Sequence, residues 1–104
     1  MAKIPDTIAQ NIDRFLTVVR QQQRIEAAYL YGSYSKGTAT AWSDVDLAIV
    51  SPDFSGDLFE EQLRLLHLAA QIDDRIEARP FRPEGFTINE PLVYEILKTG
   101  VQVA

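Results

Sequence analysis

The stretch that decides the fold is AAYLY-GSYSKG-TATAW-SDVDLAIV, which covers residues 27–50. Its two ends, residues 27–31 and 45–50, are apolar runs of strand length, and they predict two buried strands. The small residues from Gly32 to Gly37 predict a tight turn that leads into a short helix. The sequence therefore predicts two strands joined through a turn that presents the Ser33 hydroxyl and backbone N–H groups.

Two aspartates, Asp44 and Asp46, stand where the second strand begins. Because side chains alternate along a strand, both point to one face, about 6–7 Å apart, while Val45 and Leu47 point to the core. Neighbouring carboxylates repel each other unless a cation lies between them, and a hard cation such as Mg²⁺ suits oxygen ligands. We therefore predict that Asp44 and Asp46 are metal ligands. The alternative is that they only solvate the start of the strand.

The same residues form a longer pattern. Gly32-Ser33-x-x-x-Gly37, a five-residue spacer and Ser43-Asp44-x-Asp46-Leu47 resemble the signature of the polymerase-β-like nucleotidyltransferases. The resemblance implies transfer of a nucleoside monophosphate from a nucleoside triphosphate, with ATP the expected nucleotide, to an acceptor with release of pyrophosphate. The short chain is similar to the minimal branch of that family, whose members often pair with a HEPN-type protein.

The resemblance also implies roles for the motif residues. In the family, two Mg²⁺ or Mn²⁺ ions share the aspartate pair; one holds the triphosphate, and the other lowers the pKa of the acceptor hydroxyl. Gly32 and Ser33 are predicted to bind phosphate, because glycine lets backbone approach closely and serine adds a hydroxyl. Lys36 would add a charge, and Ser43 completes the nucleotide-binding set mainly by orienting the strand entry. The alternative is that these are ordinary turn residues.

The family uses a third carboxylate on a neighbouring strand. Glu77 is the candidate, because it is the carboxylate within a third apolar strand, residues 75–79. It is predicted to be a catalytic residue, as a metal ligand or general base. Asp73 and Asp74 are rivals, but they precede that strand and look like loop residues. Many relatives have Asp, and the alternative is that Glu77 faces solvent beside the neighbouring arginines.

Two other positions depart from the family pattern. Many relatives have arginine where this chain has Tyr34 and Lys36. Lysine is a point charge that cannot clamp a phosphate with two parallel hydrogen bonds, so activity is expected to be weak or to depend on a partner. Arg79 and Arg82 follow the third strand; they either compensate for these losses or belong to the solvated surface.

Composition limits the class of protein. A chain of 104 residues, 46% hydrophobic and 24% charged, predicts one domain over residues 1–104. It has no cysteine, and no apolar run near its start or elsewhere approaches membrane-spanning length, so we expect a cytoplasmic protein without a membrane partner. The net charge of −5 argues against long nucleic acid as substrate, because phosphate neutralisation supplies most of such binding.

Hydrophobic periodicity predicts three further helices outside the motif. Asp6 is expected to cap the first, which carries an apolar stripe. The second runs from about Asp57 to Ala70. The last runs from Glu90 to Lys98, with Asn89 as its cap and Gly100 in the C′ position.

The remaining signals complete the predicted fold. Pro80 is expected to end the third strand, and Val101-Gln102-Val103 can add a short edge strand. The fold class is therefore α/β (α+β), with a small mixed β-sheet, helices packed on it and a nucleotidyltransferase fold. The site is expected at the sheet edge formed by residues 32–46 and Glu77.

The helix over residues 57–70 has more apolar residues than one face needs. One stripe contains Phe59, Leu63, Leu66 and Ala70, and a second contains Leu58, Leu65, Leu68 and Ile72. The surplus indicates a covered second face in a homo-oligomer or partner complex; the alternative is one broad stripe in a small core.

Three functions remain open at this stage. The first is a metal-dependent nucleotidyltransferase whose acceptor is a HEPN-type partner protein, with an antitoxin role in a toxin–antitoxin system. The second is a catalytically weak interaction module that neutralises or scaffolds a partner. The third is nucleotidylation of a small molecule such as an antibiotic. A neighbouring gene for a small helical protein would favour the first over the third, and the intact carboxylates favour an enzyme.

Overall fold

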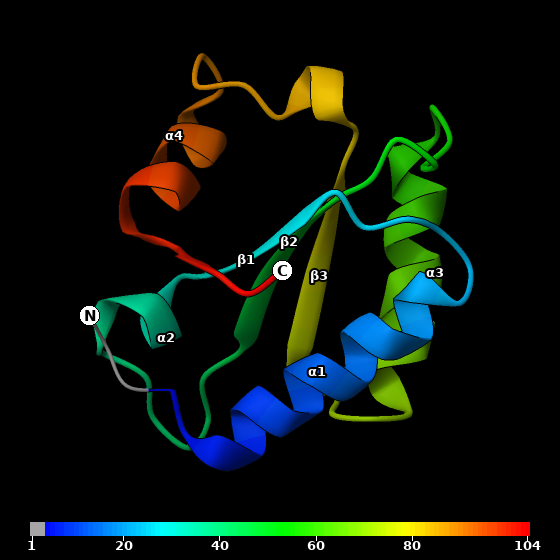
Figure 1. Ribbon diagram of the computed structural model, residues 1–104. Coiled ribbons are helices and arrows are strands. Elements are labelled where there is room, and N and C mark those ends of the chain that lie inside the picture. The colour runs from blue at the N-terminus through cyan, green and yellow to red at the C-terminus, as the bar shows by residue number, and fades with distance from the viewer. Residues whose placement is uncertain (1–3) are drawn as a thin grey trace.

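The computed structural model describes residues 4–104 and consists of a four-stranded mixed sheet with helices packed around it (Figure 1), as the sequence predicts. The strands stand in the order β3-β2-β1-β4. In chain order the elements are α1 (Asp6–Arg20), β1 (Ala27–Tyr31), α2 (Ser33–Lys36), β2 (Val45–Val50), α3 (Leu58–Ala70), β3 (Ile76–Phe81), a 3₁₀ turn (Pro83–Gly85), α4 (Pro91–Thr99) and β4 (Val101–Gln102).

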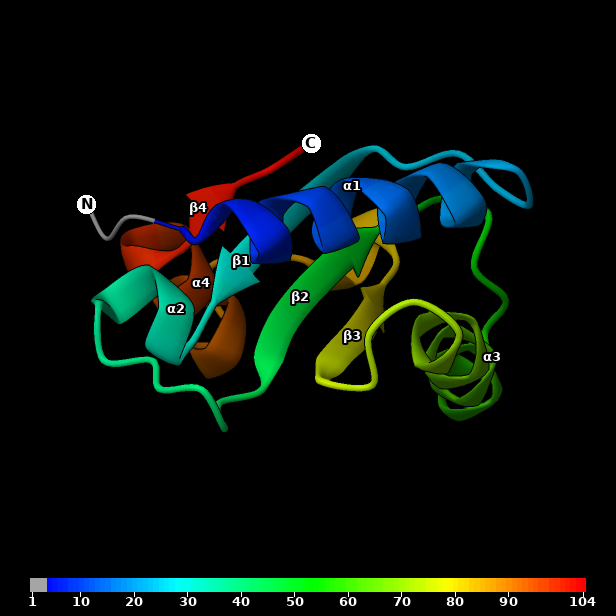
Figure 2. The ribbon, with the colours of Figure 1, turned by 90° about the horizontal axis from the view of Figure 1, so that it is seen from below.

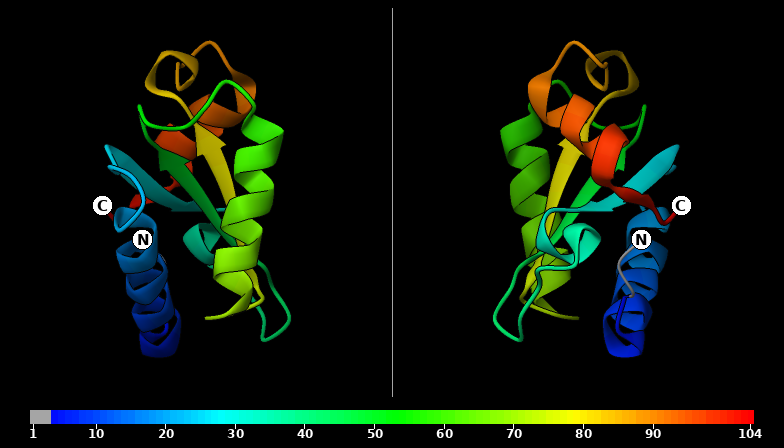
Figure 3. Two further views of the ribbon diagram at one scale, coloured as in Figure 1. Left: turned by 90° about the vertical axis from the view of Figure 1, so that its right-hand side faces the viewer. Right: turned by 90° about the vertical axis from the view of Figure 1, so that its left-hand side faces the viewer.

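Strand direction follows from the lengths of the connections. β1 runs antiparallel to β2 and to β4, whereas β2 and β3 are parallel. Parallel strands need a crossover connection, and α3 supplies it; the helix then lies along the β3 edge (Figures 1 and 3). The β3 edge of the sheet, whose strand carries Glu77, is therefore flanked by a helix.

The main core lies between the sheet and α1. Leu30, Leu47 and Ala78 form one row across three strands, and they belong to the same buried cluster as the apolar stripe of α1. Figure 2 shows α1 lying across this face, on which Phe15 and Val19 are fully buried. Each fully buried apolar side chain contributes about 1.5–3 kcal/mol, so this face supplies most of the stability.

The opposite face is covered only in part. Phe86, which follows the 3₁₀ turn, stacks on Tyr29 at 5.4 Å between ring centroids and meets Phe81 edge-on at 5.1 Å. In α4, Val93 and Ile96 are fully buried. The rest of this face, toward the start of β2 and β3, remains accessible.

Two predicted helix caps are wrong. α1 begins at Asp6 itself, with Pro5 in the N-cap position, and α4 begins at Pro91, so Asn89 lies outside the cap. Neither helix has a side-chain cap bond; proline at the first helical position suits α4, and the Asp6 charge suits a helix start. The start of α3 matches expectation, because Asp57 Oδ1 accepts a hydrogen bond from Glu60 N at 3.1 Å.

Pro80 does not end β3, contrary to the prediction. Val45 N donates to Arg75 O and Ser51 N donates to Phe81 O, so the odd-numbered residues of β3 turn their backbone groups toward β2. Pro80 therefore occupies an outward position on an edge strand, where no ladder N–H is required. The strand extends to Phe81 as a result.

Gly100 follows α4 as predicted, but with an extended backbone (φ −76°) instead of a left-handed one. A Cβ at this position would lie 2.5 Å from Ile96 O and 3.2 Å from Leu30 O. Glycine is needed here because the chain passes close to the backbone of α4 and β1.

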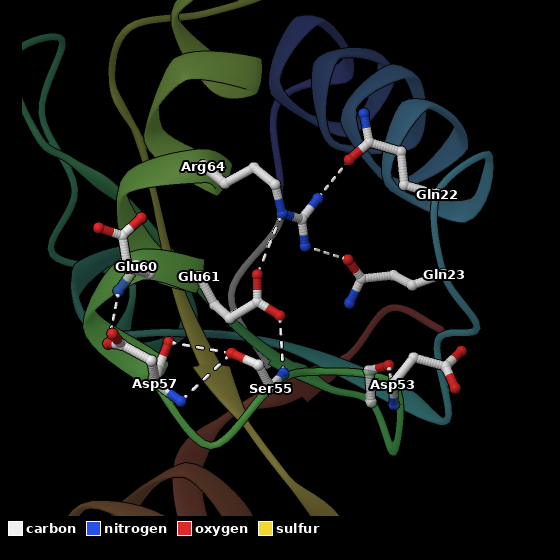
Figure 4. A network of polar contacts seen from close by, with 9 residues as sticks. Gln22, Gln23, Asp53, Ser55, Asp57, Glu60, Glu61 and Arg64 are labelled. Atoms are coloured by element: carbon white, nitrogen blue, oxygen red, sulfur yellow. Dashed lines mark hydrogen bonds and ion pairs between the residues drawn. The ribbon is translucent and has the colours of Figure 1, made fainter.

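Arg64 ties α3 to the end of α1. Its guanidinium donates to Glu61 Oε1 at 3.1 Å and to the side-chain oxygens of Gln22 and Gln23 (Figure 4). Glu61 in turn accepts from Ser55 N at 2.8 Å. This network holds the first half of α3 against the helix and the loop that precede it.

Within residues 4–104, no helix combines the length and apolarity needed to cross a bilayer.

Asp73 joins α1 to the turn before β3. Its carboxylate accepts hydrogen bonds from Asn11 Nδ2 at 3.1 Å and from Arg75 Nη2 at 2.8 Å, and its side chain is 6% exposed. The Arg75 guanidinium lowers the pKa of Asp73 from 3.8 to about 2. Asp73 is therefore a structural residue of this turn.

We expect Asp73→Asn to lower the melting temperature near neutral pH by about 4–8 °C, the shift that ~1 kcal/mol produces in a domain of this size. Because the folded-state pKa lies below the unfolded one, the stabilisation is present above about pH 4 and is lost as the pH falls toward about 2. The melting temperatures of the wild type and of Asp73→Asn, measured by thermal unfolding as a function of pH, should converge at low pH. Asp74→Asn in the same turn is the control, and a gap that persists in acid would contradict the argument.

Candidate active site

The candidate site is built on one row of residues across three strands. Tyr31 pairs with Asp46, and Asp46 pairs with Glu77 of the parallel strand β3. This row lies on the face opposite α1, next to the row Leu30–Leu47–Ala78 that points into the core. Asp46 is half-buried and Glu77 is exposed. The fold thus brings the predicted third carboxylate beside the predicted metal ligand.

Asp44 sits slightly differently from the prediction. β2 begins at Val45, so Asp44 precedes the strand and only Asp46 belongs to it. The turn before it is closed by Thr40 N, which donates to Ser43 Oγ at 2.8 Å. Ser43 therefore shapes the entry to β2, as the sequence argument expects, and Asp44 remains close enough to affect both other carboxylates.

The Gly-Ser turn packs directly against Asp46. Gly32 has φ +72°, and a Cβ there would lie 2.4 Å from Asp46 Oδ2. Gly37 ends α2 in the left-handed conformation (φ +76°). The sequence argument assigns Gly32 to close approach of a phosphate; the structure adds that this glycine also makes room for the Asp46 carboxylate.

We expect Gly32→Ala to destabilise the fold by roughly 1–3 kcal/mol, because alanine is strained at this backbone conformation, and to displace Asp46. Urea unfolding and a nucleotidyl-transfer assay measure the two effects. Gly56→Ala is the matched control, since a Cβ there meets no atom within 4 Å and its backbone is not left-handed. Equal stability and activity in the two variants would contradict this role of Gly32.

Burial and the neighbouring carboxylates raise the pKa of both Asp46 and Glu77. Burial and then the charge of Asp44 raise the pKa of Asp46. Hydrogen bonding to Asp44, which requires one protonated carboxyl, raises the pKa of Glu77, with burial and the Asp44 and Asp46 charges adding to it. Arg79 opposes both shifts. Such mutual repulsion is what a bound cation relieves.

Arg79 and Tyr31 complete the charge environment of the row. Burial raises the pKa of the Tyr31 hydroxyl, and a hydrogen bond and the charge of Arg79 oppose that shift. Neither residue is among the sequence-predicted catalytic set. Tyr31 could have been found from the sequence, because it directly precedes Gly32 at the end of the predicted first strand. Antiparallel pairing of β1 with β2 places it opposite Asp46.

Two motif positions are engaged elsewhere. Lys36 Nζ forms an ion pair with Glu95 Oε1 of α4 at 2.9 Å. Tyr34 is 5% exposed and belongs to the core. Arg82 contacts Phe54 O and Glu84 at the far end of β3. The positions at which the chain departs from the family therefore serve packing and helix docking in this structure.

A cavity of about 230 Å³ opens beside the row. Asp46 and Glu77 line one part of it, and the exposed side of α3 lines another. From the sequence, a surplus apolar face of this helix is predicted to be covered in a homo-oligomer or partner complex. No sequence signal connects that face with the carboxylates. The lining residues are Tyr31, Asp46, Phe59, Gln62, Leu63, Leu66, Glu77, Ala78 and Arg79.

The donor chemistry suits a divalent cation. Among residues 4–104, no arginine or lysine side chain forms an ion pair with Asp44, Asp46 or Glu77, so no cation of the protein already neutralises these carboxylates. Within the same residues, no three acidic or histidine side chains are gathered tightly enough to hold an ion as they stand. Asp44, Asp46 and Glu77 supply the oxygen ligands that such a cation prefers, and a bound ion would require the three carboxylates to come closer together than they stand.

Comparison with known proteins agrees with this geometry. Residues 12–98 match the family model described as the nucleotidyltransferase domain. The chain belongs to this family. The match spans the Gly-Ser turn, the carboxylate row and α3, so this nucleotidyltransferase domain carries its candidate site within the matched region.

Solved structures share the fold of this nucleotidyltransferase. A toxin–antitoxin complex with AMP-PNP has a TM-score of 0.65 at 23% identity, covering 92% of this chain and 72% of that one. A candidate nucleotidyltransferase from Sulfolobus solfataricus has a TM-score of 0.63 at 14% identity, and the match covers 98% of this chain and 89% of that one. A mutant of the toxin–antitoxin pair MntA–HpeT has a TM-score of 0.63 at 22% identity, and the match covers 89% of this chain and 71% of that one. A search of curated proteins found no match.

Proposed function

We propose that this nucleotidyltransferase moves a nucleoside monophosphate from a metal-bound nucleoside triphosphate, with ATP the expected donor, to a hydroxyl group of a HEPN-type partner protein. The observation that carries the proposal is the pairing of Asp46 with Glu77 across β2 and β3, with Asp44 and Gly32 beside them. Carboxylates arranged in this way have no evident structural purpose, because they repel one another.

Each residue of the site has a role in the proposed reaction. Asp44 and Asp46 hold Mg²⁺ or Mn²⁺, and Glu77 completes the ligand set or accepts the proton of the acceptor hydroxyl. Gly32 and Ser33 receive the triphosphate. When bound, the metal neutralises phosphate charge and lowers the pKa of the attacking hydroxyl. Lys36 contributes only if it leaves its ion pair with Glu95.

The partner class is supported by the structural neighbours. Two of them are toxin–antitoxin complexes, and one contains AMP-PNP. We propose by analogy that this chain acts as the antitoxin of a similar pair and modifies its partner. The analogy rests on shared fold and on family membership.

An interaction module without turnover is the second candidate. The Lys36–Glu95 ion pair favours it, because the one cation of the Gly-Ser turn is engaged by α4. In this case the chain would bind and neutralise its partner without modifying it. The two candidates differ in whether the partner gains mass.

The test is intact-mass analysis of a candidate partner after incubation with this chain, Mg²⁺ and each nucleoside triphosphate in turn. The proposal expects the partner to gain one nucleoside monophosphate from one preferred triphosphate. It also expects no gain when a chelator removes the metal. Tight binding of the partner without any mass gain would establish the interaction module and overturn the transferase.

A further inference from the structure

The helix α3 buries one apolar side and exposes several further apolar side chains. Leu65 and Ala69 are fully buried against the core. Phe59 is 71% exposed, Leu66 is 47% exposed, and Leu63 is also on the exposed side. Exposed apolar side chains in a row on one helix mark a surface that contacts something else.

This stripe is part of the carboxylate cavity. Phe59, Leu63 and Leu66 line the same cavity as Asp46 and Glu77. Of the residues described, none from the Gly-Ser turn, residues 32–37, lines it. The cavity therefore opens on the side of Asp46 away from the turn that receives the triphosphate in the proposed function. A group seated in it would lie beside Asp46 and Glu77.

The apolar surface extends beyond the cavity. A second, larger groove shares Phe59, Gln62 and Arg79 with it and continues over the end of β3 to the 3₁₀ turn and the start of α4. A small polar acceptor would not use this length of surface, whereas a protein would. The net charge of −5 also argues against a nucleic acid in the groove.

We infer that the α3 stripe is the docking surface for a protein acceptor, whose hydroxyl side chain enters the cavity between α3 and the Asp46–Glu77 pair, flanked by apolar groups. This inference rests on the proposed function and specifies where its acceptor binds. Apolar anchors at the centre and polar groups at the rim are the usual composition of such a surface.

The proposed transfer step forms one P–O bond and breaks another. The acceptor oxygen attacks the α-phosphorus and forms a new P–O bond. The bond from that phosphorus to the oxygen bridging the α- and β-phosphates breaks, and pyrophosphate leaves with the electron pair. The hydroxyl proton passes to Glu77 or to water. Docking through α3 would bring the acceptor oxygen into the cavity that Asp46 and Glu77 line.

The test compares Leu66→Ser with Leu97→Ser. Leu97 lies on α4, outside both grooves, and is 46% exposed, so the two changes remove equal apolar surface at matched exposure. The probes are AMP-PNP with Mg²⁺ and a purified candidate partner of the HEPN type. Calorimetry measures each affinity, light scattering measures self-association, and intact mass measures transfer. Phe59→Ser repeats the test at a second exposed position.

Leu66→Ser and Phe59→Ser should weaken partner binding and raise the KM for the partner roughly tenfold or more, with AMP-PNP affinity unchanged. Leu97→Ser should change neither. Loss of AMP-PNP affinity would show that the stripe holds the nucleotide, and a loss of dimers would show a self-association surface; either result overturns the inference, as does no effect. If the wild type transfers nothing but the partner affinities still separate as expected, the proposed function fails and the docking surface stands.

Discussion

Asp44→Asn combined with Asp46→Asn is expected to abolish Mg²⁺-dependent binding of nucleoside triphosphate. Asparagine keeps the shape of each side chain but removes the charge that would attract the cation, so the chain would no longer hold the divalent ion that compensates the triphosphate charge. Isothermal calorimetry with AMP-PNP, in Mg²⁺, in Mn²⁺ and in chelator, measures the change directly. The wild type should bind only when a metal is present, and the double variant should bind under none of the three conditions.

The double variant should remain folded. Burial and then the charge of Asp44 raise the pKa of Asp46, so removing both charges relieves burial cost and repulsion together. The melting temperature of the double variant should therefore equal or exceed that of the wild type. The single variant Asp53→Asn is a useful control. Asp53 lies in the turn after β2, at the end of the strand away from Asp44, and its carboxylate pairs with Arg24. Equal triphosphate binding with and without metal would show that these aspartates are not metal ligands.

Glu77→Gln is expected to reduce nucleotidyl transfer by roughly 10²–10⁴-fold, the range typical of losing a positioned general base. Its backbone is held beside Asp46 by the β2–β3 register, so the carboxylate is well placed to ligate the acceptor-side metal or to take the proton. Triphosphate affinity should fall much less, because the aspartate pair keeps the other metal. Single-turnover transfer and calorimetry on the same variant separate the two effects.

Conservative variants sharpen the assignment of Glu77. Glu77→Asp should retain much of the activity, since aspartate provides the same ligand with a shorter reach. Asp74→Asn should leave transfer unchanged, and Asp73→Asn should do so when assayed well below its melting temperature. A transfer assay in which Asp73 or Asp74 matters and Glu77 does not would place the third carboxylate in the turn before β3 instead of on the strand.

Local sequence signals predicted the strands and the turn of the motif well, because burial of apolar side chains or the conformational freedom of glycine alone decides each of them. The apolar runs around residues 27–31 and 45–50 are strands because every core-facing position is filled by an apolar residue. The glycines at both ends of α2 have positive φ torsions that other residues rarely adopt. The element predictions that failed were two helix caps, the C′ conformation of Gly100 and the effect of Pro80. Pro80 stays within the strand because its backbone faces away from β2.

The sequence by itself determined the mixed α/β fold, the family and the identity of the candidate carboxylates, because motif spacing and hydrophobic periodicity are properties of the chain alone. Only the tertiary structure decided that Glu77 lies opposite Asp46, since a parallel register forms between strands far apart in sequence. It also decided that Lys36 pairs with Glu95 and that the α3 stripe lines the carboxylate cavity. Those contacts depend on how the helices dock, which no local pattern encodes.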